Sequence, residues 1–254
     1  MIAAVMKFIY RLFQPVPSVC PCCGKEGRGV ASAASVMPIR HPEARAALNA
    51  LCASCRAKVP WILEIACPTC GRSERCGDCP RRAKLYFTSS RSAVRYEGDM
   101  KELLAAYKYQ GAERLAPIMA AMLASAFERI ASMHDRPFDL VTAVPLSDMR
   151  LAERGFNQAE RMAAILAGWY GLPYANLLVR TRDSDKQSLK GRGARIRDMR
   201  GLFRAAARTD SATRKRILLV DDIYTTGSTM NECAHALLQA FPEAEIHGLA
   251  WARA

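Results

Sequence analysis

The chain has 254 residues and a formal net charge of +13 at pH 7, and half of its residues are apolar. This length suits one large domain or a medium domain with a smaller one, and the apolar fraction argues against wholesale disorder. The charge favours polyanionic partners such as nucleic acid and phosphorylated metabolites, and since no run of about 18 apolar residues occurs, we expect no membrane-spanning helix.

The first thirteen residues are apolar but carry two basic side chains, Lys7 and Arg11. They lack the uninterrupted apolar core and the cleavage site of a secretory signal, so we expect a cytoplasmic protein in a reducing compartment, where disulfides are rare. A helix on the membrane surface is the alternative to a helix packed on the protein itself. The apolar stripe that predicts this helix consists of Ile2, Val5, Met6, Ile9 and Phe13.

Nine of the ten cysteines lie before residue 80, and eight of them form four Cys-x-x-Cys pairs. Two intervening residues let both sulfur atoms point to one side of a tight turn, which matches the ligand spacing of a tetrahedral metal ion. Gly24 and Gly71 directly follow two of the pairs, where a glycine can adopt positive φ without strain. The four pairs therefore predict two zinc sites, with the ligands Cys20, Cys23, Cys52, Cys55, Cys67, Cys70, Cys76 and Cys79.

The spacing does not decide which pair shares a metal ion with which. Because only five residues separate Cys70 from Cys76, two interleaved sites are credible beside two consecutive ones. An iron–sulfur cluster is the alternative to zinc, and the segment is either a structural staple or a module that binds nucleic acid or protein. Two zinc ions, each with four thiolates, would lower the formal net charge from +13 to +9.

The composition changes near residue 83, so we place a zinc-ribbon domain with its N-terminal helix in residues 1–82 and a second domain in residues 83–254. In the second domain, apolar runs alternate with helical patterns, which is typical of an α/β fold with a mostly parallel sheet flanked by helices. The expected helices begin at Asp99, Glu113, Asn157 and Thr229. The expected strands cover residues 140–144, 217–220 and 246–251.

Residues 217–229 carry the chemistry and read Ile-Leu-Leu-Val-Asp-Asp-Ile-Tyr-Thr-Thr-Gly-Ser-Thr. They predict a buried strand, two carboxylates and a loop that opens a helix, where free N–H groups and the helix dipole favour an anion. Asp221 and Asp222 can accept hydrogen bonds from sugar hydroxyls or hold Mg²⁺ through water, so a ribose 5-phosphate compound fits the site. A plain helix cap is the alternative interpretation. The predicted phosphate-binding residues are Thr225, Thr226, Gly227, Ser228 and Thr229.

The stretch from Val220 to Thr229 resembles the PRPP-binding signature of type I phosphoribosyltransferases, and the wider chain resembles the ComF family, also called the competence protein F or GntX-like family. The resemblance extends from about residue 20 to residue 251 and implies a double zinc ribbon followed by a type I phosphoribosyltransferase-like α/β domain. Asp198 departs from it, since an asparagine is expected there. Besides the cysteine pairs, it rests on residues 107–111, 144–146 and 154–159, and on Arg180, Gln187, Arg195 and Phe203.

The resemblance also assigns two further parts of the site. Pro145, Arg150 and Arg154 would belong to a pyrophosphate loop, and a solvated helix face is the alternative for both arginines. Residues 180–200 hold eight basic and three acidic residues and would form a mobile loop over the substrate, a contact for the DNA backbone, or a merely exposed loop. The basic residues assigned to this loop are Lys186, Lys190, Arg192 and Arg195.

The reaction implied by the resemblance is a displacement at the anomeric carbon of PRPP. Mg²⁺ and basic groups would stabilise the leaving pyrophosphate, and the catalytic residues Asp221 and Asp222 would hold the ribose. No segment predicts a pocket for a nucleobase, so the acceptor stays open. A non-catalytic factor that binds DNA or responds to nucleotides is the alternative. The family's link to DNA uptake and natural transformation adds single-stranded DNA and the DNA-uptake machinery to the expected partners.

Overall fold

The computed structural model describes residues 19–25, 38–109, 112–181, 201–206 and 215–254. The helix predicted in the first thirteen residues lies outside these ranges. Within them, no helix is long and apolar enough to cross a bilayer. Several predicted residues of the basic loop also lie outside the described ranges, namely Lys186, Lys190, Arg192 and Arg195.

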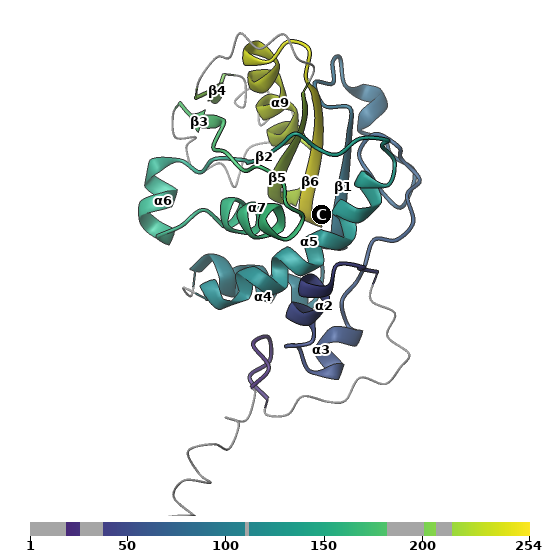
Figure 1. Ribbon diagram of the computed structural model, residues 1–254, viewed down its shortest axis with the longest axis vertical. Coiled ribbons are helices and arrows are strands. Elements are labelled where there is room, and N and C mark those ends of the chain that lie inside the picture. Colours follow the sequence, from purple (N-terminus) through teal and green to yellow (C-terminus); the bar gives the residue numbers. More distant parts are fainter. Residues whose placement is uncertain (1–18, 26–37, 110–111, 182–200, 207–214) are drawn as a thin grey trace, which may run out of the picture.

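A parallel sheet of four strands forms the centre of the described structure (Figure 1). Val220 of β5 lies beside both Ala143 of β2 and Leu249 of β6, and all three strand pairings are parallel. The prediction of a mostly parallel sheet flanked by helices is confirmed. In sheet order, the strands are β1 (Ser89–Arg95), β6 (Glu245–Arg253), β5 (Arg216–Tyr224) and β2 (Leu140–Ala143).

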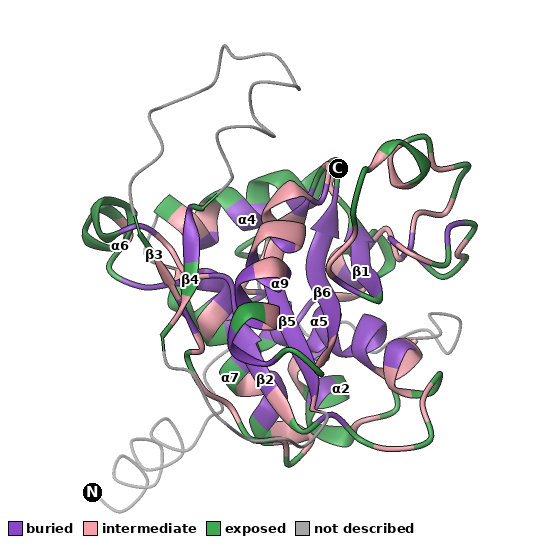
Figure 2. Ribbon diagram, turned by 90° about the horizontal axis from the view of Figure 1, so that it is seen from above, coloured by how far each residue is buried: buried purple, intermediate pink, exposed green. Residues whose placement is uncertain are grey.

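Helices cover both faces of the sheet, and Figure 2 shows the strands buried between them. Along β5, Leu218 and Val220 belong to the core with α5 and α7, whereas Ile217 and Leu219 pack with α9. Successive side chains of a strand point to opposite faces, so a strand covered on both sides is apolar at every position. One face carries α9 (Ser228–Ala240), and the other carries α2 (Pro42–Leu48), α4 (Asp99–Tyr109), α5 (Ala116–Ala131) and α7 (Gln158–Trp169).

Strand β1 is not predicted by the sequence because most of its residues are polar. The cysteine-rich segment before residue 83 supplies one partner: Arg91, 2% exposed, donates to the carbonyl oxygen of Pro68 at 2.8 Å, and also to that of its neighbour in the strand, Ser90, at 2.7 Å. The same segment extends the edge of the sheet, since the N–H of Ile62 donates to the carbonyl of Ala93 at 2.9 Å. The cysteine-rich segment and the sheet therefore share a packed interface.

The other predicted elements match the structure closely, with small differences at their ends: the helix expected from Glu113 opens with a 3-10 turn, and α5 itself begins at Ala116. The strand expected over residues 217–220 continues to Tyr224, because β6 pairs with it that far. An antiparallel pair, β3 (Leu178–Arg180) and β4 (Phe203–Ala205), packs beside α9. The remaining short helices are α3 (Ala53–Ala57), η1 (Cys79–Arg81), η2 (Glu113–Leu115) and α6 (Asp148–Arg154).

Candidate functional site

The two carboxylates near the end of β5 point to opposite faces of the sheet. Asp221 lies opposite Ala250 in the pairing with β6, so the carboxylates belong to the strand rather than to a loop after it. Asp222 pairs with Lys108 of α4, with 2.6 Å between Oδ2 and Nζ. Asp221 faces α9, where burial and then the charge of Asp221 raise the pKa of the Cys233 thiol. The predicted doublet is therefore divided between two helices.

The surroundings of Asp221 favour its protonated form. Burial raises the pKa of Asp221, and the neighbouring charge of Asp222 raises it further. The backbone N–H of Asp222, 2.8 Å from Asp221 Oδ1, and the Lys108 ammonium lower it by less. The pKa of Asp221 therefore rises to about 8.

Gly227 shapes the loop that follows β5. Its φ of 77° lies in the left-handed region that favours glycine, and α9 begins at the next residue. A Cβ atom here would also collide with the ring hydroxyl of Tyr224. The hydroxyl of Thr226 lies 2.9 Å from that of Ser228 and accepts the N–H of Ser228 at 3.4 Å. The predicted hydroxyl residues around this turn are all at least partly exposed: Thr225, Thr226, Ser228 and Thr229.

Two arginines connect this loop to the cysteine-rich segment. Arg82, which follows η1, donates to the carbonyl oxygen of Thr226. Arg253 of β6 donates to the carbonyl oxygen of Cys70 at 2.9 Å, and its guanidinium carbon lies 4.6 Å from the centre of the Tyr224 ring. The Tyr224 ring fills the space beside Gly227. Because Arg253 links this ring to Cys70, the cysteine-rich segment helps to fix the shape of the loop.

The segment between β2 and α7 contains the residues predicted for a pyrophosphate loop. Pro145 follows β2 and is half-buried, and Arg150 is exposed on α6. Arg154 donates to Oε1 of Gln158 at 2.9 Å and to the hydroxyl of Tyr109 at 3.3 Å. Its guanidinium also lies 5.2 Å from the centre of the Tyr109 ring. The structure thus leaves Arg150 open to a ligand and engages Arg154 with other parts of the protein.

Asn157 fixes the start of α7 relative to the end of β2. Its side-chain oxygen accepts hydrogen bonds from the N–H groups of Ala159 and Glu160 at 3.0 and 3.4 Å. Its amide donates to the carbonyl oxygen of Val144 at 3.0 Å. One side chain therefore caps α7 and attaches it to the residue that follows β2. This explains structurally why an asparagine stands in the Arg-Gly-Phe-Asn-Gln stretch of residues 154–158.

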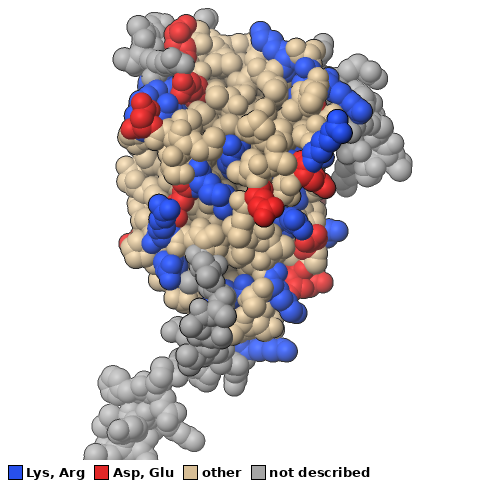
Figure 3. Space-filling view, turned by 90° about the vertical axis from the view of Figure 1, so that its right-hand side faces the viewer, with Lys and Arg blue, Asp and Glu red and all other residues tan. Residues whose placement is uncertain are grey.

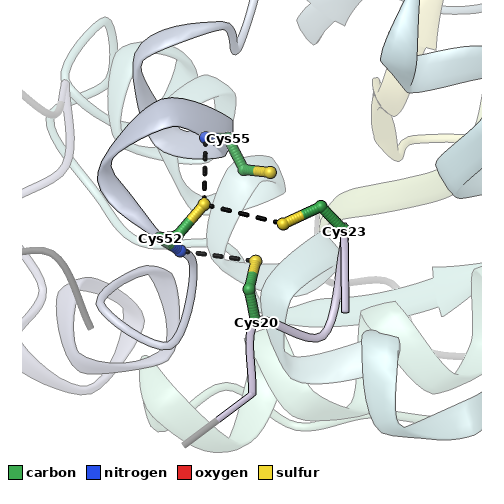
Figure 4. A group of neighbouring side chains, drawn as sticks. All are labelled: Cys20, Cys23, Cys52 and Cys55. Atoms are coloured by element: carbon green, nitrogen blue, oxygen red, sulfur yellow. Dashed lines mark hydrogen bonds between the residues drawn. The ribbon is translucent and has the colours of Figure 1, made fainter. Parts of the chain in front are cut away.

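The eight paired cysteines form two groups of four, and within each group all sulfur atoms lie within 4.8 Å of one another. The pairs combine consecutively, not in an interleaved order. A tetrahedral ion with Zn–S distances of about 2.3 Å requires sulfur atoms about 3.8 Å apart. The structure has 3.7 Å between Cys23 and Cys52 and 3.5 Å between Cys70 and Cys76, so each group could hold zinc. Figure 4 shows the first group converging on one centre: Cys20, Cys23, Cys52 and Cys55.

Backbone N–H groups favour the thiolate form in both groups. Burial raises the pKa of Cys20 and Cys76, but hydrogen bonds outweigh it. The N–H of Cys52 lies 3.4 Å from Sγ of Cys20, and the N–H of Cys79 lies 3.4 Å from Sγ of Cys76. The pKa is therefore lowered to about 6 for Cys20 and to about 7 for Cys76, whereas burial raises the pKa of Cys55, Cys70 and Cys79. Each group thus contains one cysteine whose thiolate, the form that binds metal, is favoured.

A pocket of about 680 Å³ lies beside the loop, between η1, β4 and α9, and reaches Ser228. Lys84 lies in its wall, next to the stacked rings of Tyr86 and His235, whose centres are 4.2 Å apart. Arg81 and Arg82 supply two further cations. On another face, Figure 3 shows basic side chains dispersed, with acidic ones between several of them. The pocket thus brings cations and aromatic rings together next to the loop.

The sequence alone does not single out Lys108 or Arg82 as parts of the site. Lys108 occurs in one of the stretches that carry the family resemblance, and its place in the last turn of a helix with an apolar stripe is the signal available. Arg82 lies in a basic stretch that suggests a linker. Their partners lie more than a hundred positions away in the chain, and only the fold brings them together.

No family model matches the chain. "Competence protein ComFC" of Bacillus subtilis (strain 168) is 33% identical over 205 residues, covering 77% of this chain and 81% of the relative. "Competence protein ComFC" of Streptococcus pneumoniae (strain ATCC BAA-255 / R6) is 30% identical over 225 residues, or 87% and 94% of the two chains. "DNA utilization protein YhgH" of Salmonella typhi is 27% identical over 200 residues, which cover 74% of this chain and 84% of the relative.

Among solved structures, the glutamine PRPP amidotransferase from B. subtilis is 21% identical in sequence, and the match covers 57% of this chain and 30% of that one. Its TM-score of 0.35 is too low to establish a common fold.

Proposed function

Because this chain belongs to the ComFC family of competence proteins, we propose that it binds PRPP, or a closely related ribose 5-phosphate compound, in the service of DNA uptake. The observation that carries the proposal is the junction of β5 and α9. There, two carboxylates lie directly before a loop with a glycine at positive φ that opens a helix of 13 residues. The names of the relatives, which refer to competence and DNA utilization, supply the biological context.

The loop offers the groups that a 5′-phosphate requires. The first N–H groups of α9 and the positive end of its dipole favour an anion. Gly227 allows the turn its positive φ, and the hydroxyls of Thr226 and Ser228, 2.9 Å apart, can donate to phosphate oxygens. Asp222 can accept hydrogen bonds from ribose hydroxyls. Its carboxylate is also the group that would hold the Mg²⁺ of a PRPP complex through water.

The reaction that suits this arrangement is displacement of diphosphate from the anomeric carbon. A nucleophilic atom of the acceptor forms the new bond to that carbon while the carbon–oxygen bond to diphosphate breaks, and the electron pair leaves with the diphosphate. Arg150 of α6, exposed beside the end of β2, would stabilise the departing charge. Asp222 would hold the ribose, so the protein needs no covalent nucleophile.

Calorimetry of the full chain with PRPP and Mg²⁺ tests the proposal. We expect the wild type to bind and Asp222→Ala to abolish binding while it still unfolds cooperatively, with a lowered thermal midpoint because Lys108 loses its partner. Asp135→Ala is the matched control, because the Asp135 side chain is 95% exposed and lies 3.9 Å from the Arg216 guanidinium, at the start of β5, whereas Asp222 lies near its end. Wild-type affinity in Asp222→Ala, or no binding by the wild type, would refute the ribose role.

A second candidate function is the binding of single-stranded DNA. The observation that favours it is the 680 Å³ pocket beside the loop, where basic side chains lie next to the stacked rings of Tyr86 and His235. Aromatic platforms and cations are the groups that proteins use to bind single strands. We regard DNA as a further partner of the protein and PRPP as the ligand of the β5–α9 site.

Two zinc ions are proposed as structural cofactors of the two cysteine groups. The sulfur atoms have the separations of a tetrahedral site, and hydrogen bonds from backbone N–H groups favour thiolates in both. Their chemistry would be structural, because each group offers four cysteine ligands and leaves no open position for a substrate.

A further inference from the structure

Lys108 is the cation that the fold brings to the candidate ribose site. Its ammonium nitrogen lies 2.6 Å from Oδ2 of Asp222, and the two side chains are only 14% and 18% exposed. Exposed ion pairs contribute little to stability, but a pair so far removed from water has strongly coupled charges. Lys108 therefore fixes the position of the carboxylate and balances its negative charge.

The two neighbours of Lys108 fix its place. Tyr107 is fully buried, its ring centre lies 5.1 Å from that of Phe156, and its hydroxyl donates to the carbonyl oxygen of Gln158 at 3.5 Å. Tyr109 accepts a hydrogen bond from Arg154 at 3.3 Å. Both tyrosines thus contact the segment from Arg154 to Gln158, and the lysine between them pairs with Asp222 near the end of β5.

We propose that Lys108 is a positioning residue of the phosphoribosyl site: it holds the Asp222 carboxylate in place and balances its charge, so that a polyanionic sugar phosphate can approach. The inference rests on the proposed function. Without the ammonium group, the carboxylate would repel the phosphates of the ligand and lose its fixed orientation. This role requires only a positive charge that makes one contact with the carboxylate. An arginine at the same position should therefore largely preserve binding of the ligand.

The test is calorimetry of full-length variants with PRPP and Mg²⁺. We expect Lys108→Met to weaken binding by roughly tenfold or more, as loss of one partner of a buried charge pair does. Lys108→Arg should bind within about threefold of the wild type. Lys101→Met is the matched control on the same helix, because Lys101 is exposed and its ammonium lies over the ring of Tyr96, 5.9 Å from the ring centre; this variant should bind as the wild type does.

Thermal unfolding and zinc content are measured on each variant to confirm that it is folded. If Lys108→Met binds PRPP with wild-type affinity, or if Lys108→Arg fails as completely as Lys108→Met while both remain folded, the positioning role is wrong and the proposed function stands. If the wild type itself does not bind PRPP, the proposed function and this inference fail together. The two failures are therefore distinguishable.

Discussion

At the scale of single residues, Gly227 carries a double requirement. Its φ of 77° strains any other residue, and the ring of Tyr224 occupies the space that a side chain would need. The ring cannot easily move away, because the Arg253 guanidinium lies against it and is itself bonded to Cys70. The close approach of backbone to ligand at this turn thus depends on contacts outside the loop.

Replacing this glycine separates strain from steric collision. Gly227→Ala should lower the free energy of unfolding by about 1–2 kcal/mol and abolish PRPP binding. Gly171→Ala is the matched control, since Gly171 has a φ of 64° and nothing within 4 Å of the added Cβ. It should lose less free energy of unfolding than Gly227→Ala, because it carries the strain without the collision, and keep its affinity. Urea denaturation and calorimetry measure the two effects, and normal PRPP binding by Gly227→Ala would contradict the loop assignment.

The residue order around the site could be predicted, but the direction of the side chains could not. Two adjacent carboxylates before a hydroxyl-rich loop are visible in the sequence. Within a strand, adjacent side chains point to opposite faces, so the directions of the two carboxylates depend on whether the strand includes them. It does, because β6 pairs with β5 up to Tyr224. The separation of Asp221 from Asp222, and the pairing of the latter with Lys108, follow from that tertiary contact.

At the scale of elements, apolar runs and helix starts predict what lies inside one segment. The strand in residues 140–144 and the helix after Asn157 have clear local signals, and both are present. Strand β1 has none, because its buried Arg91 and Ser90 are tolerated only where the cysteine-rich segment packs on them. Likewise, spacing leaves the partners of the cysteine pairs open, whereas the fold combines consecutive pairs.

The second cysteine group is linked to the phosphate loop, and the first group is not part of that linkage. Arg82 directly follows η1, which begins at Cys79 of the second group, and donates to the carbonyl oxygen of Thr226 in the loop. Arg253 donates to the carbonyl oxygen of Cys70 in the second group and lies against the ring of Tyr224 beside the loop. We therefore expect Cys76→Ser and Cys23→Ser each to lower the zinc content from two ions to about one per chain, with only Cys76→Ser weakening PRPP binding, by roughly tenfold. Metal analysis and calorimetry give the two readouts.

Cys22→Ser is the control for both variants, because Cys22 belongs to neither group and its pKa is raised, chiefly by burial. It should keep two zinc ions and full affinity. Equal PRPP affinity in Cys76→Ser and the wild type would show that the loop keeps its shape without the second ion. An unchanged zinc content in either serine variant would contradict the pairing seen in the structure.

At the scale of the whole molecule, the net charge of +13 draws polyanions without selecting among them. Selection requires a place where cations and rings lie together, and the pocket at η1 and α9 is such a place. It reaches Ser228, which the sugar phosphate site also uses, so the two proposed ligands would lie side by side at the start of α9.

Binding of single-stranded DNA should fall steeply with salt, because each neutralised phosphate releases counterions. Removing two cations of the pocket, in Arg81→Ala with Lys84→Ala, should reduce the salt slope by about 2 on a logarithmic plot. Asp221→Ala should leave DNA binding unchanged, since Asp221 is not among the residues that line the pocket. Fluorescence anisotropy with a labelled oligonucleotide measures both. A salt-independent affinity would exclude this surface as a DNA site.

The position of β6 has a consequence for how the protein is made. It lies between β1 and β5 in the sheet, although it follows both in sequence. A nascent chain on the ribosome therefore holds β1 apart from its neighbours until translation reaches β6. During that interval the unpaired edges of β1 and β5 are open to aggregation, and shielding by a chaperone would matter most then.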